Sequence, residues 1–145
     1  MPGPGTWSAG DVLTAADLNA IGVWDTYTPV LKQSGTRSAT VNYARYCVIN
    51  KLCILNVDLT CTTAGSAGNK ITVTMPFGAG SIVSGSGVFY DASLTDVRLL
   101  AVAEQTGEFE FFVEESTGFG GFGSDPSLAL AANDIISFSV MYEID

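Results

Sequence analysis

The sequence predicts an all-β protein: an antiparallel, jelly-roll-like β-sandwich preceded by a short N-terminal arm and helix. From Cys53 to Cys61 every odd position is apolar and the even positions 56, 58 and 60 are polar, which is the period of a half-buried strand. Residues 71–75 repeat this alternation, and Pro76 ends the segment because proline has no ladder donor. Further strand-length segments, separated by turns rich in the 16 glycines, follow at the spacing of a sandwich.

Residues 1–23 are predicted to form an anchoring arm and helix, and residues 24–145 the sandwich domain. The first ten residues are rich in Pro and Gly, and a short helix follows in DVLTAADLNAIG, with Thr14 placed to cap it and Gly22 to end it. A helix this short is unstable alone, so it must dock on the chain's own sandwich, a sister subunit or a host particle. The residues expected to make these anchoring or oligomer contacts are Trp7, Val12, Leu13, Leu18 and Ile21.

The β region begins at Trp24 as an extended segment that Pro29 marks as an edge. A turn at 34–38 leads into a long hairpin, with strands at 40–48 and 53–61 joined by a tight turn at Asn50 and Lys51. The remaining strands are expected at 88–90, 97–103, 109–113 and 135–143.

Several strands carry apolar residues on both faces. Adjacent pairs such as Ile54 and Leu55, or Leu99 and Leu100, point to opposite sides of a sheet. A sandwich strand needs one buried face, so the second apolar face suggests cover by a neighbouring subunit. The alternative is that these are central strands lying under a loop.

Between Phe112 and Ile135 the chain has more than twenty residues with little pattern, which is typical of functional or partner-stabilised loops. Its GFGGFG segment places Phe119 and Phe122 on a permissive backbone. These rings are candidate contacts for a sugar, a protein or a neighbouring subunit. Alternatively, the loop folds over the end of the sandwich with both rings in the core.

The charge argues against nucleic acid as a partner. The net charge is −9, and all of it lies in residues 99–145, whereas binding a phosphate backbone needs Lys and Arg. No signal peptide is visible and no apolar run is long enough for membrane insertion, so folding in the cytoplasm is expected. Cys47, Cys53 and Cys61 are interpreted as small buried hydrophobic residues, with a Cys47–Cys53 bridge across the hairpin as the alternative.

Catalytic chemistry is not indicated. The chain has no histidine, which removes Ser-His-Asp and Cys-His arrangements and makes zinc improbable. Glu114 and Glu115 are adjacent and would face opposite sides of a strand, so they cannot act as a glycosidase pair. Asp91 and Asp96 leave a calcium site as a weak alternative, without EF-hand spacing. We therefore expect no enzyme activity, no metal and no cofactor.

Several segments resemble proteins of tailed-bacteriophage virions. GDVLTAADLNAI resembles a short motif near the start of many phage tail and fibre proteins. The rest resembles small jelly-roll-like domains of fibre, receptor-binding and head-decoration proteins. The matching residues are Trp24, Tyr27 and Pro29 for W-x-x-Y-x-P; Tyr46, Ile49, Asn50 and Lys51 for a Y-x-x-I/V-G-x hairpin; Ile71 to Pro76 for I-T-V-T-L-P; and Asp134, Ile136, Phe138, Tyr142 and Glu143 for the closing strand. Asn50 and Met75 depart from the glycine and leucine of the pattern.

This resemblance implies a virion structural protein, typically a homotrimer, whose N-terminal segment anchors on other phage capsid or tail proteins. Its expected place is the virion surface after assembly in the host cytoplasm, as a minor tail protein, a fibre or a capsid decoration, with a host cell-surface glycan as a further expected partner. One alternative is a carbohydrate-binding module using Trp7, Trp24, Tyr90, Phe119 or Phe122 as stacking platforms. Another is a capsid-stabilising cement without host contact.

Overall fold

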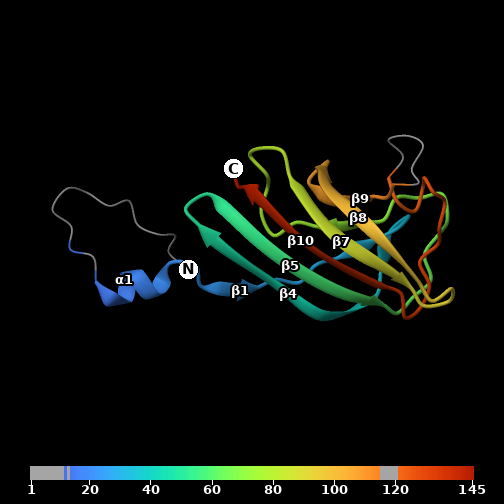
Figure 1. The fold of residues 1–145 in the computed structure, drawn as a ribbon, viewed down its shortest axis with the longest axis horizontal. Coiled ribbons are helices and arrows are strands. Elements are labelled where there is room, and N and C mark those ends of the chain that lie inside the picture. The colour runs from blue at the N-terminus through green and yellow to red at the C-terminus, as the bar shows by residue number, and fades with distance from the viewer. Residues whose placement is uncertain (1–11, 13, 115–120) are drawn as a thin grey trace.

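The computed structural model describes residues 12, 14–114 and 121–145, and it confirms the all-β antiparallel fold (Figure 1). Within these described residues, one six-residue helix precedes ten strands. The elements are α1 (Ala15–Ala20), β1 (Trp24–Thr26), β2 (Leu31–Lys32), β3 (Thr36–Arg37), β4 (Ala39–Ile49), β5 (Leu52–Cys61), β6 (Thr72–Thr74), β7 (Ser84–Asp91), β8 (Asp96–Gln105), β9 (Glu108–Phe112) and β10 (Ile135–Glu143).

The two layers of the fold are halves of one curled sheet. Its strand order is β1-β4-β5-β10-β7-β8-β9-β6-β2-β3, and every pairing is antiparallel. One extended segment, residues 24–32, joins the two ends of this strand order. Tyr27 N–H donates to Ala44 O of β4 at 3.4 Å, and Thr74 N–H of β6 donates to Val30 O at 3.1 Å. Pro29, which cannot donate to a ladder, lies where this segment changes partner. The sheet therefore forms a half-barrel whose edges are bridged by residues 24–32.

The core lies on the concave side of this sheet. In β5 the odd residues are buried and the even ones less so, as the alternation in the sequence predicts. Aromatic rings fill the centre: Phe138 contacts Phe109 and Phe111 edge-to-face, with ring centroids 5.4 and 5.1 Å apart. Such ring pairs stabilise a core beyond the apolar area they bury.

Two glycines allow the sheet to curl tightly at β7. Gly85 and Gly87 lie directly opposite Val140 and Phe138 of β10. A Cβ at Gly87 would lie 2.4 Å from Ser137 O and 2.6 Å from Phe138 Cβ, closer than atoms can approach. Because these two glycines have no side chain, the backbone of β7 can approach β10 closely.

The β4–β5 hairpin turns as predicted, with Asn50 in the left-handed region at φ 57°. The suggested Cys47–Cys53 bridge is wrong: all three cysteines are free and buried. Cys53 pairs with Val48 in the register and Cys47 with Ile54, so the two side chains point to opposite faces of the sheet. The interpretation as buried hydrophobic residues is confirmed.

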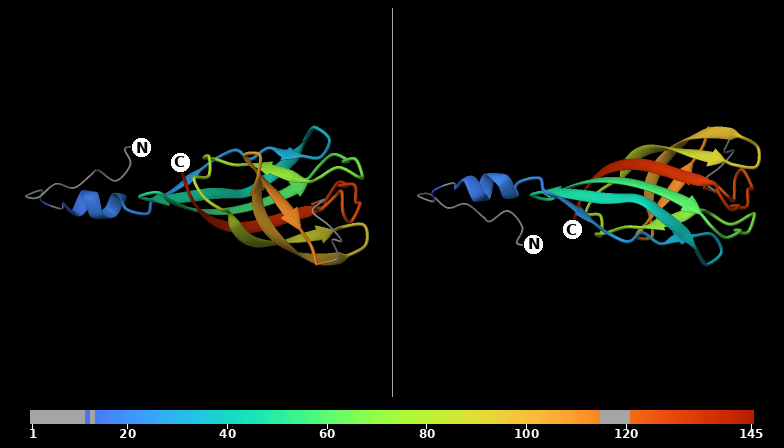
Figure 2. Two further views of the ribbon diagram at one scale, coloured as in Figure 1. Left: turned by 90° about the horizontal axis from the view of Figure 1, so that it is seen from above. Right: turned by 90° about the horizontal axis from the view of Figure 1, so that it is seen from below.

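The molecule is elongated, with different structures at its two ends (Figures 1 and 2). Helix α1 stands clear of the half-barrel at the end that holds the β4–β5 turn, and Gly22 at φ 74° ends the helical segment, as predicted. The loops at 62–71 and 121–134 gather at the opposite end, which we call the loop end.

Candidate interaction surfaces

The N-terminal segment exposes apolar side chains. Val12 is 81% exposed and Ile21 46%, and α1 projects away from the sheet rather than docking on it (Figure 2). Of the other anchoring residues expected from the sequence, Trp7 and Leu13 lie outside the described residues, as does the side chain of Leu18. The chain's own sheet is thus not the surface that covers this segment.

The loop end corrects the expectation that Phe122 contacts a partner. Its ring is fully buried and contacts Phe89 with centroids 4.9 Å apart. Its backbone is fixed as well: its N–H donates to Phe111 O at 2.7 Å, and its carbonyl accepts from Ile71 N at 2.9 Å. Glycines on both sides let the chain enter the half-barrel here, so the core alternative holds for Phe122. Phe119 lies outside the described residues.

The loop end is held together by Gln33, a buried residue that the sequence analysis missed. Its amide Nε2 donates to Asn69 O at 3.0 Å and to Leu128 O at 2.6 Å. Its Oε1 accepts from the backbone N–H groups of Ser66 and Leu130 at 3.1 and 3.0 Å. These four bonds use both donor hydrogens and both acceptor sites of the side-chain amide, and they link two loops to the end of β2. One signal was available: Gln33 continues the inward parity of Leu31, where an apolar residue is expected.

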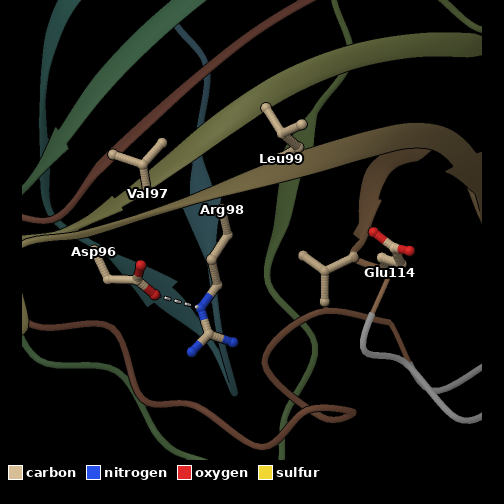
Figure 3. A pocket seen from close by; sticks show the side chains of 6 residues that line it. Asp96, Val97, Arg98, Leu99 and Glu114 are labelled. Atoms are coloured by element: carbon tan, nitrogen blue, oxygen red, sulfur yellow. Dashed lines mark hydrogen bonds and ion pairs between the residues drawn. The ribbon is translucent and has the colours of Figure 1, made fainter.

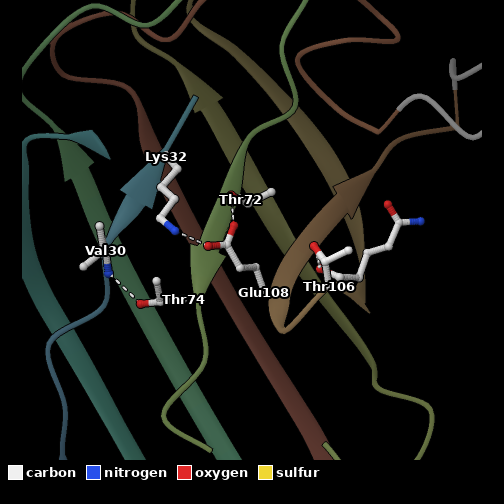
Figure 4. A network of polar contacts seen from close by, with 7 residues as sticks. Val30, Lys32, Thr72, Thr74, Thr106 and Glu108 are labelled. Atoms are coloured by element: carbon white, nitrogen blue, oxygen red, sulfur yellow. Dashed lines mark hydrogen bonds and ion pairs between the residues drawn. The ribbon is translucent and has the colours of Figure 1, made fainter. Parts of the chain in front are cut away.

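A polar network fastens β2, β6 and β9 on the outside of the sheet (Figure 4). Glu108 accepts hydrogen bonds from Lys32 Nζ and, at 2.6 Å, from Thr72 Oγ1. Partial burial alone would raise the pKa of Glu108, but these two bonds and the charge of Lys32 outweigh it and lower that pKa. Lys70 Nζ lies 2.8 Å from the buried Glu110 Oε1, close enough for an ion pair although not aligned as a hydrogen bond.

The convex side of β5, β10, β7 and β8 carries a surface that we call the outer face. Three of its apolar side chains are strongly exposed: Leu99 by 77%, Val97 by 60% and Met141 by 58%. In Figure 3, Val97 and Leu99 point to one side of β8 and Arg98 to the other. By strand register the outer face comprises Ile54, Asn56, Asp58 and Thr60 of β5, Ser84, Ser86, Val88 and Tyr90 of β7, Val97, Leu99 and Ala101 of β8, and Ile135, Ser137, Ser139, Met141 and Glu143 of β10.

A shallow groove crosses the outer face along β7. Ser86, Ser137 and Ser139 line it, with Val88 and Leu99 beside them. A second depression, lined by Ile54, Ser84, Ser86, Ser139 and Met141, continues it along the same strand. Short hydroxyl side chains therefore line both depressions, with Val88 and Leu99 beside the first and Ile54 and Met141 beside the second.

Asp91 and Asp96, the candidate calcium ligands, both have structural partners. Asp91 Oδ1 accepts from Ser93 Oγ at 2.6 Å and from the N–H groups of Ser93 and Leu94, and these bonds lower its pKa against the opposing effect of burial. Asp96 Oδ2 lies 3.3 Å from Arg98 Nε (Figure 3). Within residues 12, 14–114 and 121–145, no three His, Cys, Asp or Glu side chains are grouped to hold a metal ion. In the same part of the chain, no helix has the length and hydropathy to cross a membrane.

No protein-family model, curated protein or solved structure matches this chain.

Proposed function

We propose that this chain is a non-enzymatic structural protein displayed on the surface of a tailed-phage particle, as a homotrimeric minor tail, fibre or capsid-decoration protein. The observation that carries the proposal is that the two ends of the molecule differ in structure. An apolar segment projects from one end of a rigid β-domain, and loops cross-linked by Gln33 close the other end. The motifs at 10–21 and across the strands support the same role.

The exposed segment is the proposed anchor. Val12 and Ile21 present apolar surface to water on a helix too short to be stable by itself. Burial against a protein of the particle would remove that surface from water and fix the helix. The loop end then faces outward, where host contact takes place.

A carbohydrate-binding module receives less support. Phe122 is in the core, which leaves its ring unavailable for stacking. Trp24 is exposed, but it pairs with Cys47 near the β4–β5 turn, at the end that carries the helix.

The test is incorporation into particles. Full-length protein and the double variant Val12→Asp/Ile21→Asp are supplied from a plasmid to cells infected by a phage whose own copy of the gene is deleted, and purified particles are analysed by mass spectrometry. The proposal predicts that wild-type protein copurifies with particles and that the double variant stays in the soluble fraction. Ile82→Asp, at a loop residue that is 91% exposed, is the matched control and should be incorporated normally. Particles free of wild-type protein would contradict the proposal.

Adsorption and stability measurements on the same particles distinguish a host-contacting appendage from a capsid cement. Loss of adsorption at unchanged particle stability indicates a host-contacting appendage. Normal adsorption with particles that burst at lower temperature indicates a capsid cement.

A further inference from the structure

We infer that residues 22–26, which we call the strap, open and close on β4 while the half-barrel stays folded. The strap contains β1 and joins helix α1, which stands clear of the sheet, to the β-domain (Figure 2). Opening uncovers the thiol of Cys47 and lets α1 turn relative to the half-barrel. This movement belongs to the isolated chain, so it is tested separately from the proposed function.

Little apolar surface holds the strap on the sheet. Val23 and Trp24 are 44% and 43% exposed, and Gly22 has no side chain. β1 is the edge strand of the sheet and pairs with β4 through three residues. A segment with few buried apolar side chains opens at a lower free energy than the whole domain unfolds.

The polar contacts of the strap are weak as well. Tyr46 Oη lies 3.3 Å from Asp25 Oδ2, which is long for a hydrogen bond between oxygens. Just beyond the strap, the bond from Tyr27 N–H to Ala44 O is also long, at 3.4 Å. β2 is a short strand too, but the buried amide of Gln33 links its end to both neighbouring loops.

The chain is fixed again directly after the strap. The ring of Tyr27 contacts that of Tyr46 edge-to-face, with centroids 6.4 Å apart, and Pro29 is buried. Val30 N–H donates to Thr74 Oγ1 at 2.9 Å, and Thr74 N–H donates to Val30 O at 3.1 Å. Opening of the strap therefore ends before these residues, and the sheet edges stay bridged.

The strap covers Cys47. This side chain lies on the convex side of β4 and is buried, whereas Arg45 and Ile49 on the same side are exposed. Trp24 pairs directly with Cys47 in the register, and a Cβ at Gly22 would lie 3.7 Å from Cys47 Sγ. The reactivity of this thiol therefore measures how often the strap is open.

The test measures how fast iodoacetamide labels each cysteine of the purified full-length protein, with peptide mass spectrometry to identify the site. Cys53 and Cys61 lie in the core and serve as internal comparisons. We expect Cys47 to react at least about a hundredfold faster than these two, which become accessible only when the domain unfolds. Low denaturant concentrations should barely change the Cys47 rate, because local opening exposes little surface, but should raise the other two rates steeply.

A matched pair of variants tests the strap itself. Thr26→Gly should speed labelling of Cys47 about threefold, because glycine weakens the pairing of β1 with β4. The exposed side chain of Thr26 pairs with Arg45 and not with Cys47, so the substitution does not itself uncover the thiol. Thr36→Gly makes the same change in the exposed strand at the other edge of the sheet and should leave the Cys47 rate unchanged.

Three results would overturn the inference. Cys47 that reacts as slowly as Cys53 would mean that the strap opens only when the domain unfolds. Cys47 that reacts as fast as in the unfolded chain would mean that the strap does not cover it in solution. Equal effects of Thr26→Gly and Thr36→Gly would place the opening elsewhere. Particle incorporation is measured independently, with the Val12 and Ile21 variants, so failure of the proposed function is recognised separately.

Discussion

Gln33 shows how one side chain can organise the end of a β-domain. Its four hydrogen bonds join β2 to the backbone at Ser66, Asn69, Leu128 and Leu130. The fit is tight, since a Cβ at Gly65 would lie 1.8 Å from Gln33 Oε1. The amide adds to direct backbone bonds between the loops at 62–71 and 121–134, from Gly65 N–H to Leu130 O at 2.8 Å and from Gly68 N–H to Gly123 O at 3.1 Å.

Replacement of Gln33 by leucine should lower the free energy of unfolding by about 3 kcal/mol or more, because buried backbone groups in both loops lose their partners. Denaturant unfolding followed by circular dichroism measures this change. Gln105→Leu is the matched control, because Gln105 is an exposed glutamine whose Oε1 accepts from Lys70 Nζ at 2.7 Å, and it should change stability little. Equal effects of the two substitutions would contradict the role given to Gln33.

The lowered pKa of Glu108 makes the free energy of unfolding depend on pH. Its pKa in the folded protein is lowered from the usual 4.5, despite burial, by the bonds from Lys32 and Thr72. As the pH falls, the unfolded chain therefore takes up this proton before the folded one does. The stabilisation is present above about pH 5 and is lost as the pH falls through the folded-state pKa.

In Glu108→Gln the unfolding free energy should consequently fall less steeply between about pH 5 and pH 3 than in the wild type. Denaturant titrations at several pH values measure the slope. Gln105→Leu, which changes no titratable group, serves as the comparison and should keep the wild-type slope. A Glu108→Gln slope identical to that of the wild type would show that the ion pair contributes nothing to folding.

At the scale of elements, β7 determines how the sheet curls. Its sequence, SGSGVFYD, alternates serines on the outer face with glycines toward β10. The glycines let β7 approach Ser137 and Phe138, and the serines line a shallow groove on the convex side. One short repeat thus shapes both the core and the convex face of the sheet.

Gly87→Ala should destabilise the protein by about 2 kcal/mol, because the added methyl group meets backbone and core atoms that cannot move independently. Thermal and denaturant unfolding measure the effect. Ser86→Ala, one residue earlier on the outer face, should be close to neutral. If Gly87→Ala were also neutral, β7 and β10 would not be as close as the structure places them.

The exposed N-terminal segment should contribute to assembly and not to the stability of the half-barrel. We expect Val12→Asp/Ile21→Asp to keep the wild-type melting temperature, since both side chains already face water and such substitutions usually change stability by less than about 0.5 kcal/mol. Differential scanning calorimetry provides the measurement. A clear drop in melting temperature would mean that the segment packs on the sheet in solution.

At the scale of the whole molecule, local patterns in the sequence predicted the strands and the hairpin well. The alternation at 53–61 predicts β5 because a period of two residues depends only on which face is buried. Asn50 predicts the turn because it tolerates a positive φ. These features need no knowledge of distant residues.

The features that the sequence did not reveal depend on contacts between distant segments. The curl of one continuous sheet follows from the meeting of β7 with β10 and from bonds of residues 24–32 to both edges. The bonds of Gln33 reach up to 97 positions along the chain. Phe122 is surrounded by glycines, so no periodicity indicated whether its ring lies inside or outside.

The central claim is that this chain is displayed on a phage particle, and imaging tests it most directly. Intact particles would be examined by electron microscopy with a gold label on the chain. We expect label on the particle surface, either spread over the head, as for a decoration protein, or confined to the tail, as for a fibre or minor tail protein. Unlabelled particles, in a lysate where the chain is abundant, would contradict it.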